Sequence, residues 1–328
     1  MSGASLHSRL MTQEGIVFGL AILLFAGLAI FLDGFATVPN LLSLVQAVSV
    51  VGSLGVAMAI VVIGRAIDLS LVAIMAMPSA WFVVQVQGGA GVTEAFMLSM
   101  ALALLVGLAN GVIVAYAEVP GILVTIGSGA LTYGAVQYFF VPTDVVPLPE
   151  KLGWLSALAS GRLFGIPNVV YFFVAVALLA AGFLRLTKYG RFIYAVGDNP
   201  ESARTLGLPV RPLIVLQYLL AALIAYFVGL LLVGSVDSAN TRIFNSTMIY
   251  DVILVVVLGG VGLGGGRGGI RNVVVGTLLI GILSNGMTIL NLSYVMQNLT
   301  KATILLLAIV ADGILNPRDE QVSQQGNI

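Results

Sequence analysis

Long runs of apolar residues follow one another along almost the whole chain. A helix needs about 20 consecutive apolar residues to cross the hydrocarbon core of a bilayer. Runs near this length lie at 15–32, 46–64, 70–87, 95–117, 121–140, 168–186, 212–234, 249–265, 272–290 and 299–316. The sequence therefore predicts an all-α polytopic membrane protein with about 10 transmembrane helices, and residues 36–45 are a candidate interfacial piece.

The composition excludes a soluble fold and several classes of function. Hydrophobic residues make up 59% of the chain and charged residues only 9%, whereas soluble domains carry roughly a quarter charged residues. A formal net charge of zero argues against a nucleic-acid partner. The chain has no Cys and one His, His7, so it offers no metal cluster and no catalytic triad. We therefore predict no metal, no cofactor in this chain and no enzyme activity of its own.

The basic residues indicate the orientation, because cytoplasmic loops of membrane proteins carry an excess of Lys and Arg. With ten spans and the N-terminus inside, the cytoplasmic set is Arg9, Arg65, Arg185, Lys188, Arg191, Arg204, Arg211, Arg267, Arg271 and Arg318. The outside set is only Lys151, Arg162, Arg242 and Lys301. Both termini are therefore predicted to be cytoplasmic, as tails of residues 1–14 and 317–328 around a transmembrane domain of residues 15–316. The run 15–32 is too long for a signal peptide and is taken as the first span.

The segment 141–168 is the longest predicted external loop. Its prolines, at 142, 147, 149 and 167, exclude a long helix. We expect one short surface helix here, anchored at the membrane interface by Trp154.

The segment 187–211 is polar, basic and predicted to be cytoplasmic, and it carries the signals of a short helix. These are Asn199 or Asp198 as the N-cap, Pro200 at the first helical position, Glu201 in the first turn, Arg204 near the last turn, and Gly207 and Pro209 beyond the end. They predict a helix over residues 200–206 that stands alone in the loop.

The same segment resembles a known family. YGRFIYAVGDNPESARTLG, residues 189–207, is similar to the coupling loop of ribose-type ABC importer permeases, in the branched-chain amino acid and sugar permease superfamily. That family reads about Y-G-R-x-I-Y-A-x-G-x-N-x-x-A-A-R-x-x-G-I at this point. The alternative is a basic loop that only obeys the positive-inside rule.

Four further segments extend the resemblance over about residues 40–315. DVILVVVLGGVGLGGGRG from Asp251 resembles D-A-I-A-A-V-V-L-G-G-x-S-L-x-G-G-x-G, and NGVIVA from Asn110 resembles N-G-x-x-V-A. SNG at 284–286 followed by Leu290 resembles N-N-G-L-N-L. The match of residues 62–70 to G-G-I-D-L-S is weaker, because Arg65 and Ala66 replace its glycines. Tyr133-Gly134 also departs from the family's Arg-Gly.

No nucleotide site is predicted in the chain. The glycines at 260, 262 and 265 imitate a dinucleotide fingerprint, but their neighbours are membrane spans, not a strand and a helix. No phosphate-binding loop with Lys occurs either. If ATP drives this protein, ATP-Mg must be bound by a partner ATPase.

Five polar residues in or near the predicted spans are candidates for a translocation path: Asp68, Asn110, Gln137, Asp251 and Asn285. Polar groups inside a membrane are costly and usually face a bundle interior or a cavity. Helix–helix hydrogen bonding explains the three amides equally well. Asp68 is three residues from Arg65, so the two are expected to form an ion pair on one helical face. The alternative is that they act in gating or in the path.

The resemblance implies an ABC importer permease subunit in the bacterial inner membrane. It implies three partners: an ABC ATPase, an extracytoplasmic solute-binding protein and a second permease subunit, identical or paralogous. The implied contact with the ATPase consists of Asn199, Pro200, Glu201, Ser202, Ala203, Arg204, Thr205, Leu206 and Gly207. Ala203 and Leu206 are expected to dock on the ATPase, and Arg204 to reach a carboxylate on it or the helix's own last carbonyls. The alternative function is an ion-coupled secondary transporter of small polar solutes, and neither reading identifies the solute.

Overall fold

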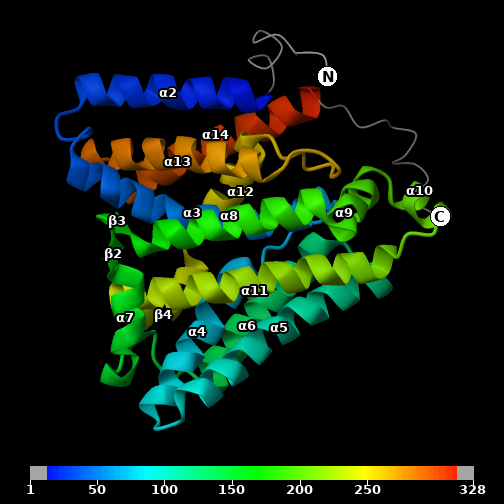
Figure 1. Cartoon of the computed structure of the whole chain (residues 1–328), viewed down its shortest axis with the longest axis horizontal. Coiled ribbons are helices and arrows are strands. Elements are labelled where there is room, and N and C mark those ends of the chain that lie inside the picture. The colour runs from blue at the N-terminus through cyan, green and yellow to red at the C-terminus, as the bar shows by residue number, and fades with distance from the viewer. Residues whose placement is uncertain (1–12, 316–328) are drawn as a thin grey trace.

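The computed structural model describes residues 13–315, and most of this part of the chain is helical (Figure 1). The long helices are α2 (Gln13–Phe31), α3 (Val38–Ile63), α4 (Leu71–Gln87), α5 (Val92–Tyr116), α6 (Gly121–Phe139), α8 (Asn168–Leu186), α11 (Val210–Val236), α12 (Met248–Gly259), α13 (Ile270–Ile289) and α14 (Tyr294–Leu315). The shorter helices are α7 (Gly153–Ser160), α9 (Lys188–Asp198), α10 (Pro200–Thr205), η1 (Glu150–Leu152) and η2 (Thr241–Asn245). The predicted tails, with His7, Arg9 and Arg318, lie outside the described residues except for residues 13 and 14.

Each of the ten predicted spans overlaps one of the long helices. Within residues 13–315, seven helices are long and apolar enough to cross a membrane: α2, α3, α5, α6, α8, α11 and α13. The apolar helices α4 and α12 are shorter, with 17 and 12 residues, and α14 is apolar over residues 294–310. Two of the boundaries differ most from the prediction. Residues 38–45 belong to α3 and not to a separate interfacial piece, and α12 stops at Gly259, six residues early, because Gly260 takes a left-handed φ of 93°.

The prediction of a purely α-helical chain is wrong in one detail. β1 (Val145–Pro147) pairs antiparallel with β4 (Ser238–Asn240), and β2 (Arg162–Leu163) pairs with β3 (Ile166–Pro167). Prolines in these connections prevent helix, so short extended segments pair instead. The short surface helix expected in 141–168 is present as α7, which lies across the ends of the long helices (Figure 1).

The helices α3–α6 and α11–α14 form two similar halves. α3 packs on α11, α12 and α13, and in the same way α11 packs on α3, α4 and α5. In each half the second helix packs on the third and the fourth. The first three helices of each half are followed within two residues by a left-handed residue: Arg65, Gly89 and Glu118 in one half, and Asp237, Gly260 and Asn291 in the other.

The two halves run in opposite directions. The end of α3 lies beside Gly197 of α9, whereas Gly234 near the end of α11 lies against Leu155 of α7. Figure 1 places α7 and α9 at opposite ends of the long helices. The fold is therefore an inverted repeat, an architecture that many transporters share. α3 and α11 form its centre, and the hydrophobic core is built mainly on them.

The predicted orientation gives a labelling result. Ser202 lies on α10 and Ser156 on α7, at opposite ends of the long helices. In this Cys-free chain, Ser202→Cys should react with an impermeant maleimide only from the cytoplasm, and Ser156→Cys only from outside. The opposite pattern at either position would contradict the orientation.

Candidate coupling and translocation site

The segment between α8 and α11 forms two consecutive helices. α10, at Pro200–Thr205, matches the predicted helix, but the prediction that it stands alone is wrong because α9 directly precedes it. α9 is amphipathic and buries Gly190, Ile193 and Val196, packing on α8, α3 and α11. Its start was recognisable from Thr187, whose hydroxyl accepts a hydrogen bond from the Gly190 N–H at 3.1 Å.

The predicted ends of α10 are present. The Asn199 side-chain oxygen accepts a hydrogen bond from the Ser202 N–H at 2.9 Å, and Pro200 occupies the first turn. Gly207 has a φ of 75°, the left-handed conformation expected after a helix. Both ends of this short helix are therefore fixed by local hydrogen bonds and backbone conformation.

The expected docking face of α10 is only partly available. Ala203 is 2% exposed because it is buried within this chain, and its carbonyl accepts a hydrogen bond from the Leu208 N–H at 3.0 Å. Leu206 is 79% exposed. The expectation that Ala203 docks on a partner is therefore wrong for this conformation, and Leu206 is the apolar side chain that α10 presents.

Arg204 also has a partner within the chain. Its guanidinium lies 3.5 Å from Glu118, in the turn between α5 and α6, and Arg211 lies 3.2 Å from the same carboxylate. The expectation that Arg204 reaches a partner's carboxylate or the last carbonyls of α10 is thus not met here. Because these side chains are about half exposed, the ion pairs contribute little stability.

The glycine-rich loop between α12 and α13 meets the end of α9 and the turn after α3, backbone against backbone. The Gly266 N–H donates a hydrogen bond to the Ile63 carbonyl at 2.8 Å. A Cβ added at Gly197 would overlap the Ile63 carbonyl oxygen and lie 2.6 Å from the Gly266 nitrogen. We name this contact of Ile63, Gly197 and Gly266 the glycine junction. It connects the α9–α10 segment to both halves of the bundle.

Tyr194 adds a side-chain contact to the glycine junction. Its hydroxyl donates a hydrogen bond to the Gly268 carbonyl at 2.9 Å. Burial raises the pKa of this hydroxyl, and the nearby charge of Arg185 opposes the change in part. Tyr194 therefore remains protonated and able to donate at physiological pH.

The expected ion pair between Arg65 and Asp68 does not form. α3 ends at Ile63, and Arg65 takes a left-handed φ of 70° and is exposed, so the two side chains do not share a helical face. Asp68 is fully buried and accepts hydrogen bonds from the Ser70 N–H at 2.9 Å and the Ser70 hydroxyl at 2.5 Å.

Asp68 belongs to a buried polar cluster inside the bundle. The Asn110 side chain on α5 donates to the Ser70 hydroxyl at 2.9 Å, so two predicted path residues meet through Ser70. Among residues 13–315, one oxygen of Asp68 and the Asn110 oxygen have no hydrogen-bond partner. The amide of Gln217 on α11, which lies against Gly64, has none in this part of the chain either. Unpaired buried polar groups are costly. This cluster is closed to solvent in this conformation.

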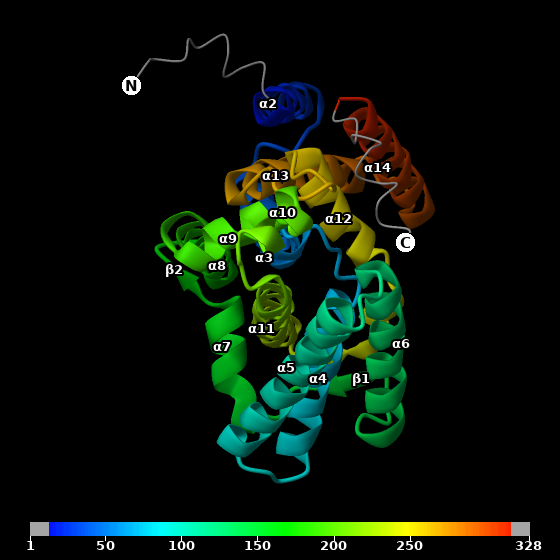
Figure 2. The same cartoon turned by 90° about the vertical axis from the view of Figure 1, so that its right-hand side faces the viewer.

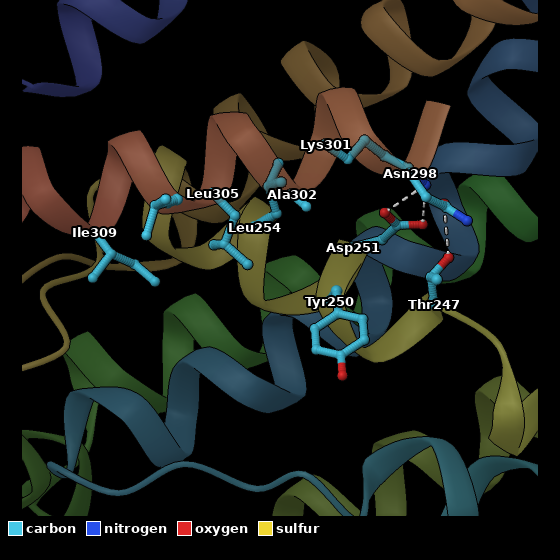
Figure 3. Close-up of a pocket in the computed structure, with 10 residues that line it drawn as sticks. Thr247, Tyr250, Asp251, Leu254, Asn298, Lys301, Ala302, Leu305 and Ile309 are labelled. Carbon is cyan, nitrogen blue, oxygen red and sulfur yellow. Dashed lines mark hydrogen bonds and ion pairs between the residues drawn. The ribbon is translucent and has the colours of Figure 1, made fainter. Parts of the chain in front are cut away.

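Asp251 forms an ion pair with Lys301 between α12 and α14. The Lys301 ammonium lies 2.7 Å from one carboxylate oxygen of Asp251 and 2.9 Å from the other. The side chain of Asp251 is 20% exposed and that of Lys301 is 12% exposed. Next to it, Thr247 donates a hydrogen bond to the Asn298 side chain at 3.1 Å (Figure 3). These four polar residues form one end of a groove of about 380 Å³, and Leu254, Leu305 and Ile309 line the rest.

The same ion pair borders a second hollow of about 360 Å³ between α3, α12, α13 and α14, which we name the α3–α13 hollow. Its other polar side chains are Ser43, Thr277, Ser284, Asn285 and Thr288. Asn285 exchanges two hydrogen bonds with Asn40, at 2.9 and 3.0 Å. The structure thus brings Asp251 and Asn285 to one hollow, whereas Gln137, half-buried on α6, lines neither cavity and has an unpaired oxygen.

A comparison with protein families decides the class of the chain. The family model described as the branched-chain amino acid transport system / permease component matches residues 40–311. The chain belongs to this permease family. Its relatives are transport subunits and not enzymes, and the permease is a multi-pass membrane protein.

Curated relatives match the permease over nearly its whole length. The ribose import permease protein RbsC of Escherichia coli (strain K12) is 31% identical, covering 92% of this chain and 94% of the relative. The L-arabinose transport system permease protein AraH of the same strain is 29% identical, covering 93% and 91%. The probable ABC transporter permease protein YphD of that strain is 27% identical, covering 97% and 94%. No solved structure matches the chain significantly.

Sequence reasoning missed three polar residues of the permease. Lys301 was assigned to an outside loop, although it is the only lysine inside a predicted span. Gln217 is a lone amide within the apolar run 212–234, and Glu118 is an acid between two spans. Each signal was visible, but the partners of Lys301 and Glu118 lie far away in the sequence, and Gln217 has no hydrogen-bond partner within residues 13–315.

Proposed function

We propose that this permease is the transmembrane subunit of an ATP-driven importer for a sugar or sugar-like solute in the bacterial inner membrane. The names of the ribose and L-arabinose permeases support the solute class, and the name of the ABC transporter relative supports the energy source. The proposed partners are an ABC ATPase that binds ATP-Mg, an extracytoplasmic solute-binding protein and a second permease subunit. The permease breaks no bonds, so its partners need only stabilise its two conformations differently.

The observation that carries this proposal is that α10 is attached, through α9, to the glycine junction. Residues 199–207 form a capped helix that presents Leu206 to solvent, and α9 connects this helix to the glycine junction. A displacement of α10 by a docked ATPase would therefore be transmitted through backbone contacts to α3 and to the α12–α13 loop. A flexible loop would absorb the displacement.

The proposed path uses two of the polar regions. The α3–α13 hollow offers hydroxyl, amide and charged groups that suit a polyhydroxylated solute, with Asp251 and Asn285 in its wall. Asp68 and Asn110 are closed to solvent in this conformation, and their unpaired oxygens would find partners if the bundle opened there. We assign Gln137 to the path only as a prediction.

Uptake into vesicles tests the proposed function. The permease, co-expressed with its candidate ATPase and binding protein, should copurify with the ATPase and import labelled ribose or L-arabinose only with ATP-Mg inside. Uptake that needs an ion gradient and no ATP would instead support the alternative, an ion-coupled secondary transporter.

Leu206→Asp should separate docking from folding. Asp at this exposed position would place an unpaired charge in the ATPase contact, at a cost of about 1–3 kcal/mol. We expect binding of the ATPase to weaken by about tenfold to a hundredfold, as measured by pull-down titration, while the thermal stability of the isolated permease stays unchanged.

Ala203→Asp is the matched comparison. Because Ala203 is buried within the chain, this change should lower the stability of the isolated permease as well as ATPase binding. If Leu206→Asp retains full ATPase binding and uptake, residues 199–207 are not the coupling element.

A further inference from the structure

The hairpin of β2 and β3 ends in an exposed phenylalanine with an unusual backbone. Phe164 has a φ of 50° and is followed by Gly165 at 81°. A left-handed conformation is a genuine outlier for a bulky residue. Phe164 is nevertheless 92% exposed, and Leu163 and Ile166 beside it are exposed as well. A two-residue hairpin turn takes φ > 0 at both central residues, so the turn itself explains this backbone. The ring of Phe164 nevertheless stays uncovered by the described residues.

The hairpin continues the apolar outer face of α8. This helix exposes Tyr171, Val174, Leu178 and Leu179, at spacings that form one stripe. Because α8 is a candidate span, the stripe lies at the depth of the hydrocarbon core. The Tyr171 hydroxyl at its first turn donates a hydrogen bond to the Leu163 carbonyl at 2.9 Å, which holds the hairpin at the end of the stripe.

The length of α8 fixes the depth of the hairpin. Its 19 residues rise about 28 Å, close to the hydrocarbon thickness of about 30 Å. The hairpin, which ends directly before Asn168, therefore lies at the membrane boundary. Seen along the long helices, β2 and α8 lie on the rim of the bundle (Figure 2).

We propose that the tip of this hairpin, residues 163–166, inserts into the lipid leaflet at the α7 end, which the predicted orientation makes the outer leaflet. Phe164 would enter the region where acyl chains meet headgroups, and the exposed Arg162 would lie beside lipid phosphates. Lipid is favoured over the solute-binding protein because the apolar surface continues the exposed stripe of a candidate span and lies at the rim. The contact fixes α8 relative to the bilayer, while α9 at its other end carries α10.

Tryptophan fluorescence tests the insertion. The chain has two tryptophans, Trp81 and Trp154. In the variant Trp81→Phe, Trp154→Phe, Phe164→Trp, reconstituted in nanodiscs, we expect blue-shifted emission that is strongly quenched by phosphatidylcholine brominated near the headgroup and little by iodide. The matched control moves the reporter to α10 with Leu206→Trp in the same background, where iodide should quench and brominated lipid should not.

Emission from position 164 that iodide quenches and brominated lipid does not would overturn the proposal, because it would place the tip in water. The Cys-free chain allows a second measurement that keeps both tryptophans. A spin label on Phe164→Cys should be more accessible to oxygen than to a water-soluble nickel complex, and the reverse ratio also overturns the proposal. Neither experiment depends on transport, so failure of the proposed function leaves them interpretable.

Discussion

Replacing Gly197 with Ala is expected to abolish uptake and to destabilise the permease. The added Cβ would overlap the Ile63 carbonyl oxygen, which accepts the hydrogen bond from Gly266. Backbone atoms on both sides leave no flexible side chain that can move away. Overpacking of this kind costs about 1–3 kcal/mol, and the loss of the hydrogen bond adds about 0.5–1.5 kcal/mol. Thermal unfolding and ATP-driven uptake measure the two effects.

Gly182→Ala in α8 is the matched control. A Cβ there would meet only the end of Leu186, at 4.0 Å. Ala is favoured over Gly inside a helix by about 0.5–1 kcal/mol, so this variant should be as stable as the parent or slightly more stable. If Gly197→Ala behaves like Gly182→Ala, the glycine junction is not a rigid contact.

Asp251→Leu should prevent the permease from accumulating in a folded form. The change leaves Lys301, whose side chain is only 12% exposed, without the carboxylate that lies 2.7 Å from its ammonium. Removal of one partner from a buried ion pair costs about 3–5 kcal/mol. The yield of monodisperse protein in detergent measures the effect, and Lys301→Met should give a similar loss.

The double variant Asp251→Leu, Lys301→Met separates structure from transport. Replacement of both partners of a buried ion pair by apolar residues is often neutral or stabilising, so the folded yield should recover. Uptake should stay low, because the α3–α13 hollow has lost the two charged groups in its wall. Normal uptake by the double variant would show that the pair is structural and would remove this hollow from the proposed path.

Local features were predictable from the sequence because their causes are local. Asn199 and Gly207 bound α10 through their own side-chain and backbone properties, and apolar runs locate the ten long helices. The prediction of an ion pair between Arg65 and Asp68 was wrong for a related reason. A spacing of three places side chains together only within a helix, and α3 ends before Arg65.

Contacts between distant segments could not be predicted from the sequence. Asp251 and Lys301 are 50 residues apart, and the glycine junction joins residues near 63, 197 and 266 through backbone atoms that carry no residue-specific signal. The roles of residues 199–207 in coupling, and of the five path candidates, stay predictions. What the structure adds is which of these candidates share a cluster or a hollow.

The shortness of α12 constrains how the chain is inserted into the membrane during synthesis. Its 12 residues rise about 18 Å, well short of the hydrocarbon thickness of about 30 Å. Irregular backbone on either side must complete the crossing, and such backbone is tolerated only where protein surrounds it. In the folded protein α3, α13 and α14 surround α12. We therefore expect α12 to enter the membrane after α13 and α14 have left the ribosome, as part of a preassembled group of helices.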